Sequence, residues 1–128
     1  MHYNAFILLV DDYEFIRTIL ERMLQQLGYQ NLRMAADGVD ALHLLRTRPI
    51  DLVITDYHMP EMDGIDLFRS MQQDPVLAKI PVLLISGVPT AKVVTQALAM
   101  EIQSTLNQSF RAEQLDQEIQ SLLTQSLS

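Results

Sequence analysis

The chain has 128 residues, a length typical of one domain, and carries a formal net charge of −7. This acidic balance disfavours direct binding to nucleic acid or to an anionic membrane surface, because both are negatively charged. The absence of cysteine excludes disulfides and thiolate metal sites and fits a protein of the reducing cytoplasm. The first apolar run is too short for a signal peptide, and no segment is long enough to span a membrane.

Five short runs along the chain are predicted to be strands. The first, third and fourth are rich in Ile, Val and Leu and are too brief for helices. Such runs are typical of strands covered on both faces, as in a parallel sheet. The second and fifth runs are less apolar. In chain order the predicted strands are residues 5–10, 31–35, 52–55, 80–85 and 102–106.

A helical periodicity follows each of these runs. The first predicted helix has Gly28 as its C-terminal stop, and the second and third end before Pro49 and Pro75. The apolar positions that define the five helices are Ile16, Ile19, Leu20, Met23, Leu24 and Leu27; Ala41, Leu42 and Leu45; Ile65, Leu67, Phe68 and Met71; Val93, Val94, Ala97 and Leu98; and Leu115, Ile119, Leu122 and Leu123.

The alternation of strands and helices predicts an α/β fold of the (βα)5 type, with right-handed crossovers and helices on both faces of a parallel sheet. In such a sheet, functional residues collect at the carboxyl ends of the strands. The first strand delivers Asp11 and Asp12 to that edge, the third delivers Asp56 and the fourth delivers Ser86.

Three carboxylates at one edge of a sheet need a cation to remain ionised together. Oxygen ligands without cysteine favour a hard ion, and Mg²⁺ is the usual one where phosphate is also bound. We expect Asp12 and Asp56 to hold the ion and Asp11 to orient a water. One aspartate oxygen then remains as a nucleophile, as in aspartyl-phosphate chemistry, and Ser86 could donate a hydrogen bond to the phosphoryl group.

The acidic pair has a simpler interpretation, because an aspartate after a strand is often only the N-cap of a helix. The presence of Asp56 and Ser86 at neighbouring strand ends favours the functional interpretation. Asp63 and Gly64 are instead predicted to form a turn and cap at the start of the third helix.

The stretches "LLVDD", "DLVITDYHMPEMDG" and "VLLISG", at this spacing, resemble the receiver domain of two-component response regulators. The resemblance runs from about Phe6 to about Leu123, and the motif D-x-x-M-P-x-M-D-G at residues 56–64 is its most specific part. It implies a flavodoxin-like, doubly wound sheet with strand order 2-1-3-4-5. It also implies a single receiver domain over residues 1–128 that is not an enzyme and signals by binding partners.

The resemblance assigns a role to each residue of the site. Asp56 matches the phosphoacceptor, which receives phosphate from a histidine kinase or a histidine phosphotransfer protein. Asp11 and Asp12 match the metal-binding pair, and the backbone carbonyl of His58 matches a third protein ligand of Mg²⁺. Ser86 matches the residue that moves towards the phosphate. The change is relayed to the surface of the fourth helix, fifth strand and fifth helix, where a downstream protein or homodimer partner would bind.

The stretch "LNQSF" at residues 106–110 departs from the Lys-Pro-Phe of the family. Gln108 stands in the place of the lysine and Ser109 in the place of the proline, whereas Phe110 is retained. Thr105 replaces an aromatic residue that swings inward on activation, and Glu101 replaces a glycine.

These departures weaken the expected response to phosphate. Gln108 offers a neutral amide where lysine offers a cation, and charge-assisted hydrogen bonds are roughly twice as strong as neutral ones. Ser109 removes the main reason for a cis peptide bond, and Thr105 is too small to act as an aromatic gate. Lys92 or Lys79 could replace the missing cation from another position.

Three functional hypotheses follow. The first is a stand-alone receiver that is phosphorylated on Asp56. The second is a pseudo-receiver, a protein-interaction or dimerisation module that works without phosphorylation. The third, a metal-dependent phosphatase with an aspartate nucleophile, is disfavoured because such enzymes need a second aspartate where this chain has His58.

Overall fold

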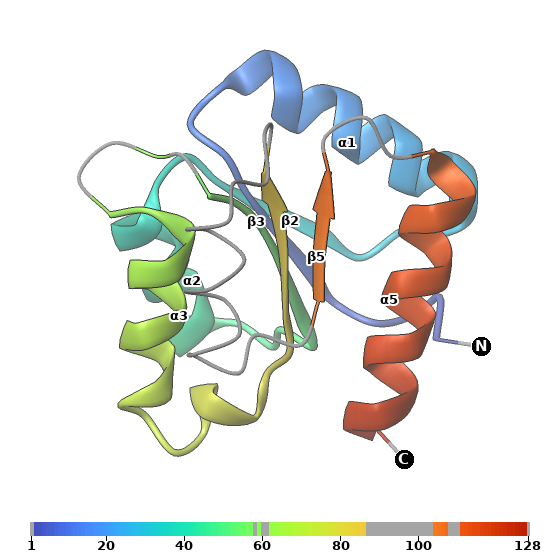
Figure 1. The fold of residues 1–128 in the computed structure, drawn as a ribbon. Helices are drawn as coiled ribbons and strands as arrows, with labels where there is room; N and C mark the ends of the chain where they lie inside the picture. Colours follow the sequence, from blue (N-terminus) through green and yellow to red (C-terminus); the bar gives the residue numbers. More distant parts are fainter. Residues whose placement is uncertain (1, 58, 60–61, 87–103, 108–110, 128) are drawn as a thin grey trace.

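A parallel five-stranded sheet lies at the centre of the molecule, with strand order β2-β1-β3-β4-β5, as predicted (Figure 1). The computed structural model describes residues 2–57, 59, 62–86, 104–107 and 111–127. Within them the strands are β1 (Ile7–Val10), β2 (Leu32–Ala35), β3 (Leu52–Asp56), β4 (Val82–Ser86) and β5 (Ser104–Asn107).

Helices cover both faces of this sheet. They are α1 (Glu14–Leu27), α2 (Gly38–Thr47), α3 (Gly64–Gln72) and α5 (Ala112–Leu127), with a short 3₁₀ helix, η1 (Leu77–Lys79), before β4. Helices α1 and α5 pack on one face, and α2 and α3 pack on the other (Figure 1). The fourth helix predicted around residues 93–98 lies outside the described residues. Where the chain is described, no helix is both long and apolar enough to cross a membrane.

Alternate residues of the strands belong to two separate cores. On β1, Leu8 points into the core under α2 and α3, whereas Ile7 and Leu9 point into the core under α1 and α5. Because successive side chains of a strand point to opposite faces, a strand covered on both sides must be apolar at every position. This explains the continuous apolar runs in the sequence.

The strand boundaries differ slightly from the prediction. Strand β1 begins at Ile7 and not at residue 5, because the backbone of Phe6 is engaged by Asp51: Phe6 N–H donates to Asp51 Oδ2 at 2.9 Å, and Asp51 N–H donates to the Phe6 carbonyl at 2.7 Å. Strand β4 begins at Val82, after Pro81, which has no N–H to contribute to a ladder.

The ends of the helices follow the predicted signals only in part. Helix α1 ends at Gly28, whose φ of 111° is left-handed, and α3 begins with a capping box between Asp63 and Asp66. The start of α1 differs from the N-cap interpretation of the acidic pair. Its N-cap residue is Tyr13, and no side chain caps it.

A buried tyrosine fastens α5 to the end of α1. Tyr29 is fully buried, and its hydroxyl donates to Asp116 Oδ1 at 2.6 Å and accepts from Gln120 Nε2 at 2.8 Å. Burial, followed by the bond to the Asp116 carboxylate, raises the pKa of Tyr29. Tyr3 packs against Tyr29, with ring centroids 4.8 Å apart and ring planes inclined at 45°, and its hydroxyl donates to Asp116 Oδ2 at 3.2 Å. The two tyrosines thus share one carboxylate.

Replacing Tyr29 should therefore cost more stability than replacing Tyr3. We expect Tyr29→Phe to lower the free energy of unfolding by about 1–3 kcal/mol, because it leaves buried polar groups without their partner. Tyr3→Phe removes a longer bond at a more exposed position and should cost less. Urea unfolding of the two variants makes the comparison, and an equal or larger loss for Tyr3→Phe would contradict it.

Candidate functional site

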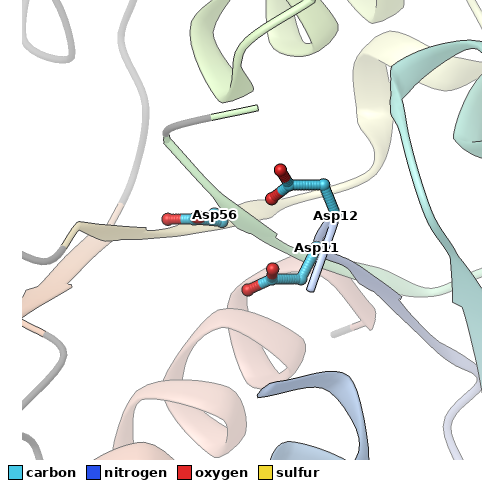
Figure 2. A group of neighbouring side chains, drawn as sticks. All are labelled: Asp11, Asp12 and Asp56. Atoms are coloured by element: carbon cyan, nitrogen blue, oxygen red, sulfur yellow. The ribbon is translucent and has the colours of Figure 1, made fainter. Parts of the chain in front are cut away.

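Three aspartates meet at the carboxyl edge of the sheet, as the sequence predicted. Asp11 follows the last residue of β1, and Asp56 is the last residue of β3. These strands are neighbours, and Val10 pairs with Thr55, so the next residues, Asp11 and Asp56, emerge side by side. Asp11, Asp12 and Asp56 each offer one oxygen within 4.8 Å of the others, and we call them the acidic cluster. Figure 2 shows the three side chains extending from the strand ends in the same direction.

The acidic cluster is largely shielded from water. Asp11 is 2% exposed and Asp56 is 6% exposed. Oδ1 of Asp12 is buried and has no hydrogen-bond partner within the described part of the chain. Because a buried carboxylate oxygen without a donor is costly, this geometry calls for a positive group at that oxygen.

Electrostatics within the cluster favour protonation of Asp11. Burial, and then the charges of Asp56 and Asp12, raise the pKa of Asp11 to about 6. Two features oppose the rise: the N–H of Tyr13 donates to Asp11 Oδ1 at 2.9 Å, and the positive charge of Arg17 attracts the carboxylate. These two features are weaker than burial and repulsion, so the net shift is upward.

Arg17 was not predicted from the sequence as part of the site. Its Nη1 donates to the backbone carbonyl of Asp11 at 2.6 Å, which fixes the guanidinium beside the acidic cluster. The sequence carried a usable signal, because Arg17 lies in the first turns of α1, directly after the acidic pair, and helical spacing turns it back towards the strand end.

A depression of about 350 Å³ opens beside the acidic cluster. It is lined by Asp11 and Asp56 and by three residues at the start of α1: Tyr13, Phe15 and Ile16. Phe15 is 75% exposed and Tyr13 is 63% exposed. Because both line the same depression, they lie together beside the acidic cluster and are not scattered exposed residues. Neither residue was predicted from the sequence to belong to the site, because Tyr13 precedes α1 and Phe15 lies off its apolar face.

The structure places some of the other predicted residues and leaves others undescribed. Ser86 ends β4, one residue beyond Ile85, which pairs with Asp56; its backbone thus reaches the edge that carries the acidic cluster. Thr105 lies in β5, where it pairs with Leu84. The side chains of Ser86 and Thr105, and all of His58, Gln108, Ser109, Phe110, Lys92 and Glu101, lie outside the described parts.

Lys79 cannot replace the missing lysine of the site. It ends η1, which precedes the first residue of β4, and so it lies at the amino edge of the parallel sheet. The acidic cluster lies at the opposite, carboxyl edge. The prediction that Lys79 could supply the cation is therefore wrong.

The acidic cluster has the donor set that Mg²⁺ prefers. It offers only carboxylate oxygens, and one of them, Asp12 Oδ1, is buried with no donor among the described residues. Hard divalent cations bind such oxygen sites and stabilise the ionised form of each ligand. The residues present therefore fit a Mg²⁺ ion.

The raised pKa of Asp11 predicts a pH effect in the absence of metal. Between about pH 4 and about pH 6 the folded state holds a proton on Asp11 that the unfolded state has lost, so stability falls as the pH rises through this window. The expected contribution is on the order of 1–3 kcal/mol.

In EDTA, Asp11→Asn should therefore lose less stability than the wild type between pH 4.5 and pH 7, as measured by urea unfolding. The exposed Glu113→Gln variant removes the same charge from α5 and should keep the wild-type slope. Identical slopes in all three proteins would contradict the assigned burial and repulsion at Asp11.

Comparisons with known proteins agree with this fold and cluster. Residues 7–120 match the family described as "Response regulator receiver domain". The chain is 34% identical over 116 residues to chemotaxis protein CheY-3 of Vibrio cholerae, covering 91% of this chain and 89% of that protein. It is 33% identical to chemotaxis protein CheY of Pseudomonas aeruginosa, covering 91% and 94%.

Solved structures show the same likeness. The signal receiver domain of an HD domain-containing protein from Pseudomonas fluorescens superimposes with a TM-score of 0.87 at 32% identity, covering 96% of this chain and 97% of that one. The receiver domain of the sensor histidine kinase PA1611 from Pseudomonas aeruginosa, solved with magnesium coordinated in its active-site cleft, has the same fold, with a TM-score of 0.85 at 23% identity and coverage of 94% and 98%. With its (βα) order, its acidic cluster and a family match over most of its length, this chain belongs to the response regulator receiver domains, and its relatives are of the CheY type.

Proposed function

We propose that this chain is a phosphorylatable receiver in which Asp56 accepts a phosphoryl group from a histidine kinase or a histidine phosphotransfer protein. The observation that carries the proposal is the acidic cluster: three carboxylates within 4.8 Å, with Asp56 opening onto a depression at the sheet edge. Membership of the receiver family supports the same role. The absence of cysteine fits action in the cytoplasm.

Mg²⁺ would be held by Asp12, Asp56 and the backbone carbonyl of His58, with Asp11 bound through a water. When bound, the ion neutralises the carboxylates and the oxygens of the incoming phosphoryl group. A carboxylate oxygen of Asp56 then attacks the phosphorus, the bond from phosphorus to the donor histidine breaks, and the imidazole takes up a proton as it leaves. Asp11 is kept in place by the N–H of Tyr13, and Arg17 holds its backbone carbonyl.

The start of α1 suits the docking of the phosphodonor. Phe15, Tyr13 and Ile19 are 75%, 63% and 42% exposed, and the first two line the depression that contains Asp56. An apolar surface beside the reactive carboxylate can pack against the apolar face of a helix and bring its histidine to Asp56. A downstream protein or a second copy of the chain would bind at the surface that includes β5 and α5.

A pseudo-receiver remains the second candidate because of one feature of the sequence: Gln108 and Ser109 replace the lysine and proline of the family pattern. Without the lysine, the phosphorylated state gains a weaker hydrogen bond, and the energy available for a conformational change is smaller. In that case binding of a partner would be unaffected by Asp56→Asn and by the phosphoryl mimic beryllofluoride.

Phosphorylation can be tested with a small donor. Incubation with acetyl phosphate and Mg²⁺ should give one phosphoryl adduct in intact-mass spectrometry, because the nucleophile and the metal ligands are present. Asp56→Asn should abolish the adduct, and EDTA should suppress it. The Glu113→Gln variant should be modified like the wild type. Absence of any adduct on the wild type would contradict the proposed function and leave the pseudo-receiver.

Docking can be separated from chemistry by a second test. Phe15→Ser should slow phosphotransfer from a phosphorylated histidine phosphotransfer protein about tenfold, the effect of losing one well-packed interface anchor. It should leave the rate with acetyl phosphate unchanged. Val76→Ser is the matched control, because Val76 is 72% exposed but precedes β4 at the opposite edge of the sheet. Equal slowing by both variants would remove the assignment of α1 as the docking surface.

A further inference from the structure

We infer that Gly38 and Met62 are positioning residues of the phosphoacceptor site, although neither belongs to the acidic cluster. The contact between them fixes Met62, which lies two residues before Gly64, and the backbone of Gly64 meets that of Asp56. The inference rests on the proposed function only in taking Asp56 as the reacting carboxylate.

The side chain of Met62 lies in the space that a side chain at position 38 would need. A Cβ atom built on Gly38 would lie 2.3 Å from Sδ, 2.7 Å from Cγ and 3.0 Å from Cβ of Met62. Real Cβ atoms essentially never approach other atoms as closely as the first two distances, and because Sδ and Cγ belong to a flexible side chain, Met62 is the residue that would move. Gly38 is not in the left-handed region, where Gly28 lies. It is therefore the contact with Met62, and not the backbone conformation, that requires glycine at position 38.

Gly38 provides a fixed surface against which the side chain of Met62 packs. It is the buried first residue of α2, and the preceding residue, Asp37, caps the helix by accepting from Asp40 N–H at 2.8 Å. Met62 itself is partly buried and packs against the core under α2 and α3. Met62 thus packs onto the capped end of α2, and the position of that helix is set by the rest of the same core.

Gly64, at the start of α3, lies directly against Asp56. Met62 precedes Asp63, the N-cap of α3, and Asp63 precedes Gly64. A Cβ on Gly64 would lie 2.7 Å from the backbone oxygen of Asp56, and the N–H of Gly64 donates to the Tyr57 carbonyl at 3.0 Å. A displacement of Met62 is therefore transmitted, over two residues of chain, to the backbone that carries the phosphoacceptor.

A further methionine strengthens this interpretation. Met59, which also lies between β3 and α3 in the sequence, is 8% exposed, and its sulfur accepts the hydroxyl of Thr55 at 3.9 Å. The side chain of Met59 thus contacts β3, and that of Met62 contacts the start of α2. Because the thioether is flexible and apolar, it can fill the small space left by a missing side chain. The turn between β2 and α2 therefore becomes a part of the site's supporting structure.

Amide hydrogen exchange, measured in EDTA, tests the contact without relying on metal or phosphate. The reporters are the amides of Tyr57, which donates to the Ile85 carbonyl at 2.9 Å, and of Gly64. Gly38→Ala should accelerate exchange at both amides about tenfold beyond its effect on global unfolding, because it displaces Met62. Met62→Ala removes the obstructing side chain, so the double variant Gly38→Ala/Met62→Ala should exchange no faster than Met62→Ala alone.

The control is Gly28→Ala. Alanine at position 28 is strained, because the backbone there has a φ of 111°. This variant should lower global stability without a specific effect on the two reporter amides. Equal effects of Gly28→Ala and Gly38→Ala on these amides, or additive effects in the double variant, would overturn the inference. Should Gly38→Ala fail to fold, recovery of folding in the double variant supports the contact, and failure of that variant too rejects it.

A parallel Mg²⁺ titration by NMR separates this inference from the proposed function. Gly38→Ala should weaken Mg²⁺ binding about tenfold, and the added Met62→Ala should reverse part of that loss. If the wild type bound no Mg²⁺ while the exchange rates changed as described, the proposed metal site would be wrong and the positioning contact would stand.

Discussion

The repulsion between carboxylates at the carboxyl edge of the sheet is the constraint on which this structure depends. Parallel pairing of β1 with β3 brings Asp11 and Asp56 together, and Asp12 joins them within 4.8 Å. The pairing is fixed by apolar packing on both faces of each strand, so the carboxylates cannot separate to relieve their repulsion. The energy of the two cores thus holds the three carboxylates close together although their charges repel, and a cation is the natural partner of such an arrangement.

The supporting residues act on this cluster through the backbone. Arg17 binds the carbonyl of Asp11, the N–H of Tyr13 binds its carboxylate, and Gly64 lies against the carbonyl of Asp56. Each of these contacts limits the positions that a carboxylate can adopt. None of the three contacting residues is itself a proposed metal ligand. The positions of Asp11 and Asp56 therefore depend on residues directly after β1 and at the start of α3.

The sequence was sufficient to predict the alternation of strands and helices and the meeting of Asp11, Asp12 and Asp56, because apolar runs and strand ends are local features with a direct structural meaning. The strand order 2-1-3-4-5 was predicted from the resemblance to receiver domains. The sequence also identified the cap at Asp63. It could not identify the contact of Met62 with Gly38, because the two residues lie far apart in the sequence and the motif that contains Met62 does not show what its side chain contacts. Nor did it identify the exposed Phe15. Helical periodicity predicts which residues of α1 are buried, and it gives no information on the function of the exposed ones. Lys79 was misjudged because charge alone does not tell which edge of the sheet a residue occupies.

The central claim is that the acidic cluster binds a divalent cation. The most direct measurement is a Mg²⁺ titration followed by amide NMR shifts of the wild type and of Asp12→Asn at neutral pH. The account predicts saturable shifts centred on residues 11–13 and 56–57, with binding weakened at least tenfold in Asp12→Asn, since the buried Oδ1 then loses its charge. An absence of saturable shifts at those amides, or equal affinity in the two proteins, would contradict it.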